Sequence, residues 1–198
     1  EKPLMIIHQS GHFGVFNRHA LALAGIDDCN KTIPGGLIRC EADGTTPNGV
    51  LEENAFFGAL RVFQSSIDPA YAVDLFEQGM QLFASYGYTT AQEGRAFAAS
   101  LMTAEARVDQ GLLPIDVALY LDYTAKEQMT ASPYYSGSGY GGIGYTDGFR
   151  IAGVKLTIDG SPQGKTAWLS EPYFVAPHGQ PADYVGYPAM TEQQVNDE

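Results

Sequence analysis

Two kinds of hydrophobic pattern alternate along the chain. Apolar side chains at helical spacing predict amphipathic helices over residues 17–24, 52–64, 70–86 and 95–110. Short apolar or β-branched runs predict strands at residues 4–8, 37–41, 49–51, 88–94, 115–122 and 151–158. The run at 4–8 reads as a buried strand, and the run at 115–122 suits a strand that is buried on both faces. From residue 68 the order is helix, strand, helix, strand, long loop, strand, which is typical of α/β proteins with parallel strands.

Local capping signals support these helices. Asn17 is a suitable N-cap for the first helix, and Gly25 stands where a helix ends. Asp68 followed by Pro69 is a typical helix opening, and the apolar face of the helix that follows is expected to be core. Thr191 begins a capping box only a few residues before the last residue, which we interpret as the start of a helix in a longer chain.

Composition narrows the classes of partner. The chain has 198 residues, 44% of them hydrophobic, and a net charge of −12, so nucleic acid and anionic membranes are not expected partners. Its apolar runs fall short of the ~20 residues that a membrane helix needs. Cys29 and Cys40 show no metal-binding spacing; two unpaired buried thiols are the favoured interpretation, and a disulfide in an oxidising compartment stays open. The compartment itself is not predicted.

The loop at 130–148 is rich in Tyr, Gly and Ser and contains a literal GxGxxG at 137–142. A dinucleotide site is not predicted, because no strand leads into this motif and no helix follows it. We interpret the loop as a lid or insertion whose tyrosines can stack on a ligand.

The last predicted strand carries a charged residue among apolar ones. Lys155 lies within it, and Asp159 follows four residues later, so the period of two places both side chains on one face. Burying a lysine is costly without a partner, and active sites of α/β proteins lie at the carboxyl ends of parallel strands. An ordinary ion pair on a half-buried strand is the alternative.

Four segments resemble one branch of the metal-dependent amidohydrolases, the branch that includes N-substituted formamide deformylases. They are HFGVFNRHALALAGI at 12–26, PGGLIRCEADGTTPNGVLEE at 34–53, YGYTT at 86–90 and FRIAGVKLTIDGSPQGKTAWLSEPY at 149–173. The resemblance implies an α/β fold in which residues 67–198 form part of a (β/α)₈ TIM barrel. Residues 1–66 would be an inserted region with a strand, a helix and a β-hairpin. A whole barrel needs about 250 residues and eight units, so a partial barrel is expected.

The resemblance also implies roles for seven residues. Lys155 would be the carboxylated lysine that binds metal, and His12 and Glu93 would act at the catalytic centre. Substrate-binding roles are predicted for the remaining four, Asn17, Asp159, Gln163 and Trp168. Other interpretations remain open: His12 as a locally bonded turn histidine, Glu93 as a carboxylate at a helix N-terminus, and Asp159, Ser161 and Gln163 as residues that shape the turn.

The family's metal ligands are largely missing from the sequence, which has no His-x-His pair. We therefore expect a divalent metal, zinc by preference, in the parent enzyme and none bound to this chain alone. The expected partners are a small-molecule amide substrate and either a second copy or the rest of the parent chain. Two rivals remain: a complete, non-catalytic small-molecule-binding α/β domain, and a small hydrolase with Ser161 as nucleophile, which lacks a G-x-S-x-G elbow.

Overall fold

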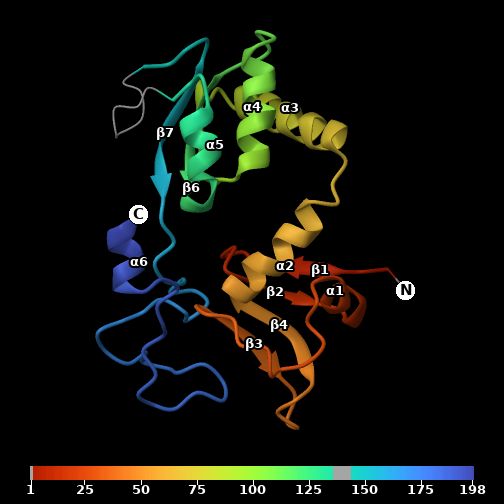
Figure 1. Cartoon of the computed structure of the whole chain (residues 1–198), viewed down its shortest axis with the longest axis vertical. Coiled ribbons are helices and arrows are strands. Elements are labelled where there is room, and N and C mark those ends of the chain that lie inside the picture. The colour runs from red at the N-terminus through yellow and green to blue at the C-terminus, as the bar shows by residue number, and fades with distance from the viewer. Residues whose placement is uncertain (1, 136–143) are drawn as a thin grey trace. The chain divides into compact units, whose positions relative to one another are not determined.

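The computed structural model describes residues 2–135 and 144–198 and divides the chain into two compact units (Figure 1). Unit 1 combines residues 1–66 with 157–198, and unit 2 consists of residues 67–156. The sequence-based division also falls after residue 66, but it assigns residues 157–198 to the barrel segment. In the structure, those residues pack with 1–66 instead. The GxGxxG at 137–142 lies outside the described residues.

Unit 1 is built on a four-stranded antiparallel sheet. The strands have the spatial order β1-β2-β4-β3, and the elements are β1 (Met5–Ile7), β2 (Phe13–Phe16), α1 (Arg18–Leu23), β3 (Gly36–Cys40), β4 (Pro47–Glu53), α2 (Asn54–Gln64) and, near the C-terminus, α6 (Glu192–Asp197). Helix α2 packs on β3 and β4, and its buried Phe56 meets Phe16 from β2 edge to face. Burial of large aromatic side chains of this kind is a principal source of stability.

Unit 2 is built on a three-stranded parallel sheet of order β5-β6-β7. Its elements are α3 (Pro69–Ser85), β5 (Thr90–Ala96), α4 (Ala98–Val108), β6 (Asp116–Asp122), a 3₁₀ turn η1 (Tyr123–Ala125), α5 (Lys126–Ala131) and β7 (Phe149–Lys155). The central strand β6 is almost wholly buried, as its near-continuous apolar run predicts. Helices α4 and α5 contact this sheet, and α3 contacts α4. Within the described residues, no helix combines the length and hydrophobicity needed to cross a bilayer.

Several local predictions are confirmed. The side chain of Asn17 caps α1, and that of Asp68 caps α3 with Pro69 in its first turn. Thr191 and Gln194 form both bonds of the predicted capping box. These signals act over three or four residues, so the sequence alone is enough to read them.

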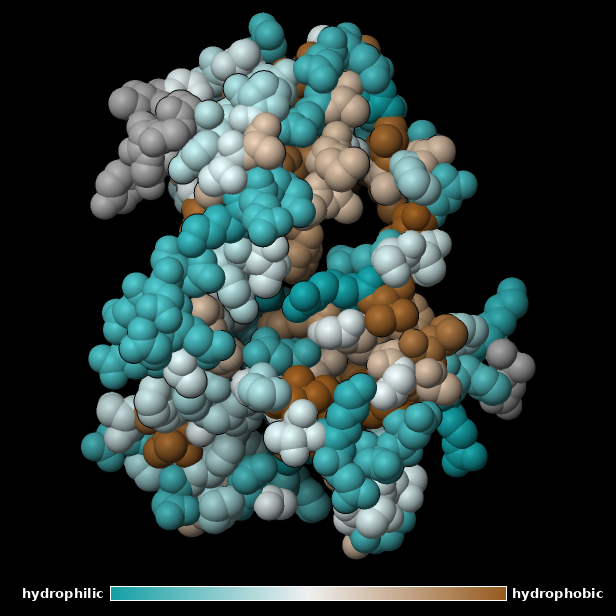
Figure 2. Space-filling model, viewed as in Figure 1, coloured by the Kyte–Doolittle hydropathy of each residue, from teal (hydrophilic) through white to brown (hydrophobic). Residues whose placement is uncertain are grey.

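Two predictions of burial are wrong. Strand β1 is an edge strand of its sheet, and its Ile6 is 60% exposed. Helix α3 has no buried residue: on its predicted core face, Leu75 and Phe83 are 45% and 44% exposed. Phe76 and Met80 of the same face are partly buried and pack against the core of unit 2, so the amphipathic spacing identified the helix and only part of a packed face. Figure 2 shows further apolar side chains, in brown, on the face in view.

Two predicted element boundaries are also wrong. The strand predicted over 151–158 ends at Lys155, and Lys155 pairs with Asp122, the last residue of β6. Beyond that pair β6 turns into η1, so β7 has no neighbour with which to continue the ladder. Lys155 and Asp159 therefore do not share a strand face, and they lie in different units. Similarly, the helix predicted from residue 95 begins at Ala98, because Arg95 and Ala96 still belong to β5.

The two cysteines form a disulfide, so the favoured interpretation of two free thiols is wrong. Cys29 and Cys40 have Cα atoms 6.3 Å apart, within the range that a disulfide can bridge. The bond joins the loop after α1 to the end of β3. The backbone N–H of Cys29 also donates to the carbonyl of Thr45, 3.0 Å away, which holds the same loop against the β3–β4 turn.

Candidate functional site

A histidine–carboxylate pair lies where β2 begins and β4 ends. His12 immediately precedes β2, and Glu53 is the last residue of β4. The backbone N–H of Glu53 donates to the His12 carbonyl at 2.8 Å. The ring Nδ1 of His12 lies 2.8 Å from Oε2 of Glu53. The Glu53 side chain is completely buried, whereas that of His12 is 25% exposed. The imidazole is therefore partly accessible, while its Nδ1 is tied to a buried acid.

The turn that follows residue 157 supplies the second partner of this carboxylate. The hydroxyl of Thr166 bonds to Oε1 of Glu53 and accepts the backbone N–H of Ser161 at 3.0 Å. Ser161 Oγ in turn accepts the N–H of Gly164. Ser161 thus shapes this turn, one of the roles considered from the sequence, and the hydrogen bond described for its hydroxyl is to Gly164 rather than to a histidine.

A second buried carboxylate lies beside the first. Glu52 accepts hydrogen bonds from Nε of Arg39 at 2.8 Å and from the hydroxyl of Tyr187 at 3.1 Å. Burial, reinforced by the negative charge of Glu52, raises the pKa of Tyr187 far above its ordinary value. Tyr187 therefore stays protonated and donates to Glu52. Both neighbouring glutamates thus bind the segment 157–198 to the antiparallel sheet.

In unit 2, polar residues gather at the carboxyl end of the parallel sheet. Asp122 ends β6 and is 1% exposed; it accepts Nε of Arg95 at 2.7 Å and the hydroxyl of Thr124. Burial on its own raises the pKa of Asp122, but the hydrogen bonds from Thr124 and Arg95 outweigh burial, and the pKa lies below its ordinary value. Asp122 is thus a satisfied carboxylate that holds β5 to β6.

The two predicted catalytic residues of unit 2 lie on the outer strands of the parallel sheet, Glu93 in the middle of β5 and Lys155 at the end of β7. Glu93 is exposed on β5, and its carboxylate accepts the backbone N–H of Arg95 at 2.8 Å. Lys155 ends β7 opposite Asp122, but its side chain is exposed, so the burial expected of it is wrong. His12 belongs to unit 1. The catalytic roles of the three remain predictions.

The four predicted substrate-binding residues occupy separate places in unit 1. Asn17 caps α1 and also accepts the N–H of Leu4 at 3.1 Å, and it borders a cavity of about 490 Å³ beside α1. Asp159 accepts the backbone N–H of Trp168 at 2.9 Å. The ring of Trp168 is 59% exposed, and Gln163 is exposed as well. Asp159 therefore has a turn-shaping bond, while substrate contacts by these residues stay predictions.

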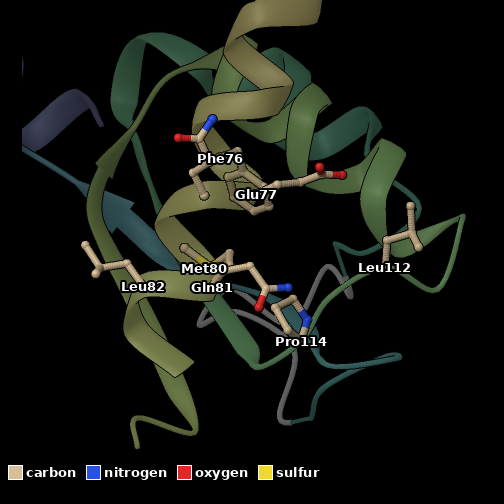
Figure 3. A pocket seen from close by; sticks show the side chains of 8 residues that line it. Phe76, Glu77, Met80, Gln81, Leu82, Leu112 and Pro114 are labelled. Carbon is tan, nitrogen blue, oxygen red and sulfur yellow. The ribbon is translucent and has the colours of Figure 1, made fainter. Parts of the chain in front are cut away.

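A cavity of unit 2 is lined by none of these groups. It measures about 660 Å³ and is lined by residues of α3 together with Leu112 and Pro114. Figure 3 shows Met80 and Gln81 of α3 near Pro114, with Leu82 and Leu112 toward opposite sides of the view. The titratable side chain in this lining is Glu77, which pairs with Arg107 at 3.0 Å. The cavity therefore offers an apolar surface rather than reactive chemistry.

The donor atoms present do not make up a metal site. In the part of the chain that the structure describes, no three His, Cys, Asp or Glu side chains are grouped so as to hold a metal ion. The carboxylates of Glu53 and Asp122, which are the most deeply buried, are already satisfied by histidine, arginine and hydroxyl groups. No catalytic step through a metal is therefore derived from these residues.

A model of the "Amidohydrolase family" matches residues 1–197, nearly the whole chain. The chain belongs to the amidohydrolase family. This membership confirms the family recognised from the four sequence segments. One family model thus accounts for all four segments together, which composition and periodicity alone could not do.

Two solved structures resemble this amidohydrolase chain. One is an uncharacterized metal-dependent hydrolase from Pyrococcus horikoshii OT3, with 21% sequence identity and a TM-score of 0.63 over 98% of this chain and 35% of its own. The other is an uncharacterized metal-dependent hydrolase from Pyrococcus furiosus, with 20% identity and a TM-score of 0.65 over 100% of this chain and 37% of its own. The likeness shows a shared α/β fold with a parallel sheet and helices. The amidohydrolase chain spans little more than a third of either structure. No curated protein matched it.

Sequence reasoning did not single out Glu53 or Thr166 as site residues. Glu53 closes the quoted segment 34–53, but its partners lie 41 and 113 residues away. No local spacing connects residues so far apart. The sequence signal nearest to this site is Asp159-Gly160, followed by Thr166 six residues later. This pattern by itself predicts only a turn.

Proposed function

We propose that the protein to which this chain belongs is a metal-dependent hydrolase that cleaves a C–N bond of a small-molecule amide or formamide. The observation that carries the proposal is family membership over residues 1–197. The fold shared with two metal-dependent hydrolases supports it. The resemblance of residues 12–26 and 149–173 to formamide deformylases supports the choice of bond.

Within this function, we assign proton transfer to His12. Its Nδ1 is occupied by Glu53, and the ring is partly exposed, so Nε2 is the nitrogen left for a substrate. His12 would first accept a proton at Nε2 from the attacking water and then return it from Nε2 to the departing nitrogen, a task that suits an imidazole near neutral pH. Glu93, Lys155 and the four substrate-binding residues keep the roles predicted from the sequence.

The metal is assigned to the parent protein. A divalent ion, zinc by preference, is expected there, with Lys155 as the ligand that this chain would contribute. Because the sequence has no His-x-His pair, we propose that most of the ligand set comes from the remainder of the parent. The three parallel strands of unit 2 would then be part of a (β/α)₈ barrel, and this chain alone would be inactive.

Association follows from the same proposal. Leu75, Leu82 and Phe83 of α3 are exposed, and β5 and β7 are edge strands of their sheet in the described structure. Uncovered surfaces of both kinds favour contact with other polypeptide. We propose self-association of this chain, or association with the rest of its parent.

Hydrolysis assays with metal analysis test the function. N-substituted formamides and simple amides are offered to the parent-length protein and to this chain, each with its metal content measured. The parent is expected to hydrolyse at least one of them, to lose that activity to a chelator and to regain it with a divalent metal. Hydrolysis by the parent that survives complete metal removal would overturn the proposal. So would a metal-loaded parent that cleaves neither substrate class.

A further inference from the structure

Glu53 occupies a position that is unfavourable in two respects. Its side chain is completely buried, although an isolated carboxylate is costly to remove from water. Its backbone has a φ of 47° and a ψ of −123°, in a region that side-chain-bearing residues rarely adopt. A conformation of this kind is strained and persists where surrounding contacts enforce it. At Glu53 these contacts are the hydrogen bonds of its carboxylate with His12 and Thr166.

Both oxygens of the Glu53 carboxylate are held. Oε2 faces Nδ1 of His12 at 2.8 Å, and Oε1 faces the Thr166 hydroxyl. That hydroxyl already accepts the N–H of Ser161 at 3.0 Å. Since a hydroxyl carries one proton, the Thr166 proton is directed to Glu53. Thr166 is 1% exposed, so this hydrogen bond is protected from water.

The backbone of Gly160 packs directly against the Glu53 carboxylate and the Thr166 hydroxyl. A Cβ at this position would lie 2.1 Å from Oγ1 of Thr166 and 2.4 Å from Oε1 of Glu53. Backbone therefore approaches the Thr166–Glu53 bond more closely than any side-chain-bearing residue permits. Three segments distant in the sequence converge on one carboxylate, and all of them belong to unit 1.

We propose that Glu53, fixed by Thr166, is a positioning residue that sets the tautomer and direction of the His12 ring. A carboxylate accepts hydrogen bonds, so it selects the neutral imidazole that carries its proton on Nδ1. Nε2 then carries the lone pair of a ring that is partly exposed. A buried acid that orients a histidine by this bond is a general device in catalytic sites. The effect on catalysis rests on the proposed function, whereas the effect on the tautomer does not.

The tautomer is measured by NMR on this chain with ¹⁵N-labelled histidine, at a pH where the imidazoles are neutral. Four histidines contribute, and His12→Gln identifies the signals of His12. We expect the Nδ1–H form for His12 in the wild type. Glu53→Gln should shift His12 toward the Nε2–H form that free histidine prefers. An Nε2–H tautomer in the wild type, or a tautomer unchanged in a folded Glu53→Gln variant, would overturn the proposal.

A matched pair at Thr166 tests the supporting bond. Thr166→Val removes the hydroxyl at nearly equal volume, and Thr166→Ser retains it. We expect Thr166→Val to mix the tautomers of His12 and Thr166→Ser to leave the wild-type tautomer. Equal spectra for the two variants would refute the role of Thr166. This pair also decides the question if Glu53→Gln fails to fold.

Kinetics of the parent-length enzyme separate the two proposals. With the formamide or amide that it hydrolyses, Glu53→Gln is expected to lower kcat on the order of 10- to 100-fold, the usual loss when an outer partner of a functional histidine is replaced, with KM little changed. If the parent cleaves neither substrate class while NMR shows the Nδ1–H tautomer, the proposed function fails and the positioning role stands. If catalysis occurs and Glu53→Gln leaves kcat unchanged, the positioning role in catalysis is refuted.

Discussion

Replacing Gly160 with alanine tests the packing around Glu53 directly. The φ of Gly160 is not among the positive values, so its backbone suits alanine and the available space alone decides the outcome. The new methyl group would meet Oγ1 of Thr166 at 2.1 Å and Oε1 of Glu53 at 2.4 Å. Neither group can retreat easily, because both are buried and hydrogen-bonded. One of them, or the turn itself, must move.

The expected loss follows from three contributions. Overpacking a close-packed site costs about 1–3 kcal/mol. Disrupting a buried hydrogen bond to a carboxylate costs about 1–3 kcal/mol more. Alanine offsets roughly 0.4–1 kcal/mol of this by restricting the unfolded chain. The free energy of unfolding of Gly160→Ala should therefore fall by about 1–6 kcal/mol, which at a urea m-value of about 2 kcal/mol/M lowers the midpoint by about 0.5–3 M.

Trp168 fluorescence provides the assay, because the chain has one tryptophan and it belongs to unit 1. Gly58→Ala is the matched control: Gly58 lies within α2 of the same unit, and a Cβ there meets no atom within 4 Å. That control should be neutral or stabilising by up to about 1 kcal/mol, as alanine is favoured within helices. A Gly160→Ala midpoint equal to that of wild type would refute the close approach of this turn to Glu53.

Three further outcomes are expected. Reducing the Cys29–Cys40 disulfide, which closes a loop with a sequence separation of 11, should lower the free energy of unfolding by up to about 3 kcal/mol in urea melts with and without reductant; identical melts would contradict this. The folded pKa of Asp122 lies below its ordinary value, so its stabilisation is present above about pH 4 and is lost as the pH falls through the folded pKa. Far-UV circular dichroism should accordingly show a smaller acid-induced loss of stability for Asp122→Asn than for wild type, and equal losses would contradict the assignment. Leu82 is 58% exposed on α3, and Leu82→Lys should weaken self-association in sedimentation velocity, whereas a wild-type chain that stays monomeric at high concentration would contradict the proposed association.

Predictions that depend on neighbouring residues were the most reliable. The caps at Asn17, Asp68 and Thr191 need information from three or four residues, and all three are observed. The buried strand β6 (Asp116–Asp122) was also predicted correctly, because a strand covered on both faces shows no alternation of polar and apolar residues. Residues 95 and 96 were misassigned since their pairing with β6 extends β5, and a helical pattern gives no information about that pairing.

Predictions that depend on distant neighbours failed for physical reasons. The apolar spacing of α3 shows that one face avoids water, but it does not say which polypeptide covers that face. Lys155 and Asp159 are separated by the end of β7, and that end is set by where β6 stops rather than by the residues of β7. Cys29 and Cys40 pair because the loop after α1 folds onto the β3–β4 turn, which their spacing alone left open.

Gly160 is a residue from which part of the candidate site could have been predicted. Glycine beside Asp159 and Ser161 is explained in two ways: the turn needs a left-handed residue, or another group comes too close for a Cβ. The structure decides for the second, since the φ of Gly160 is ordinary and the space beside it is filled by Thr166 and Glu53. A glycine of this second kind indicates a crowded group beneath it. That group is a buried carboxylate bonded to a partly exposed histidine. The turn is therefore better understood as a segment packed over the Glu53 carboxylate than as a simple connecting loop.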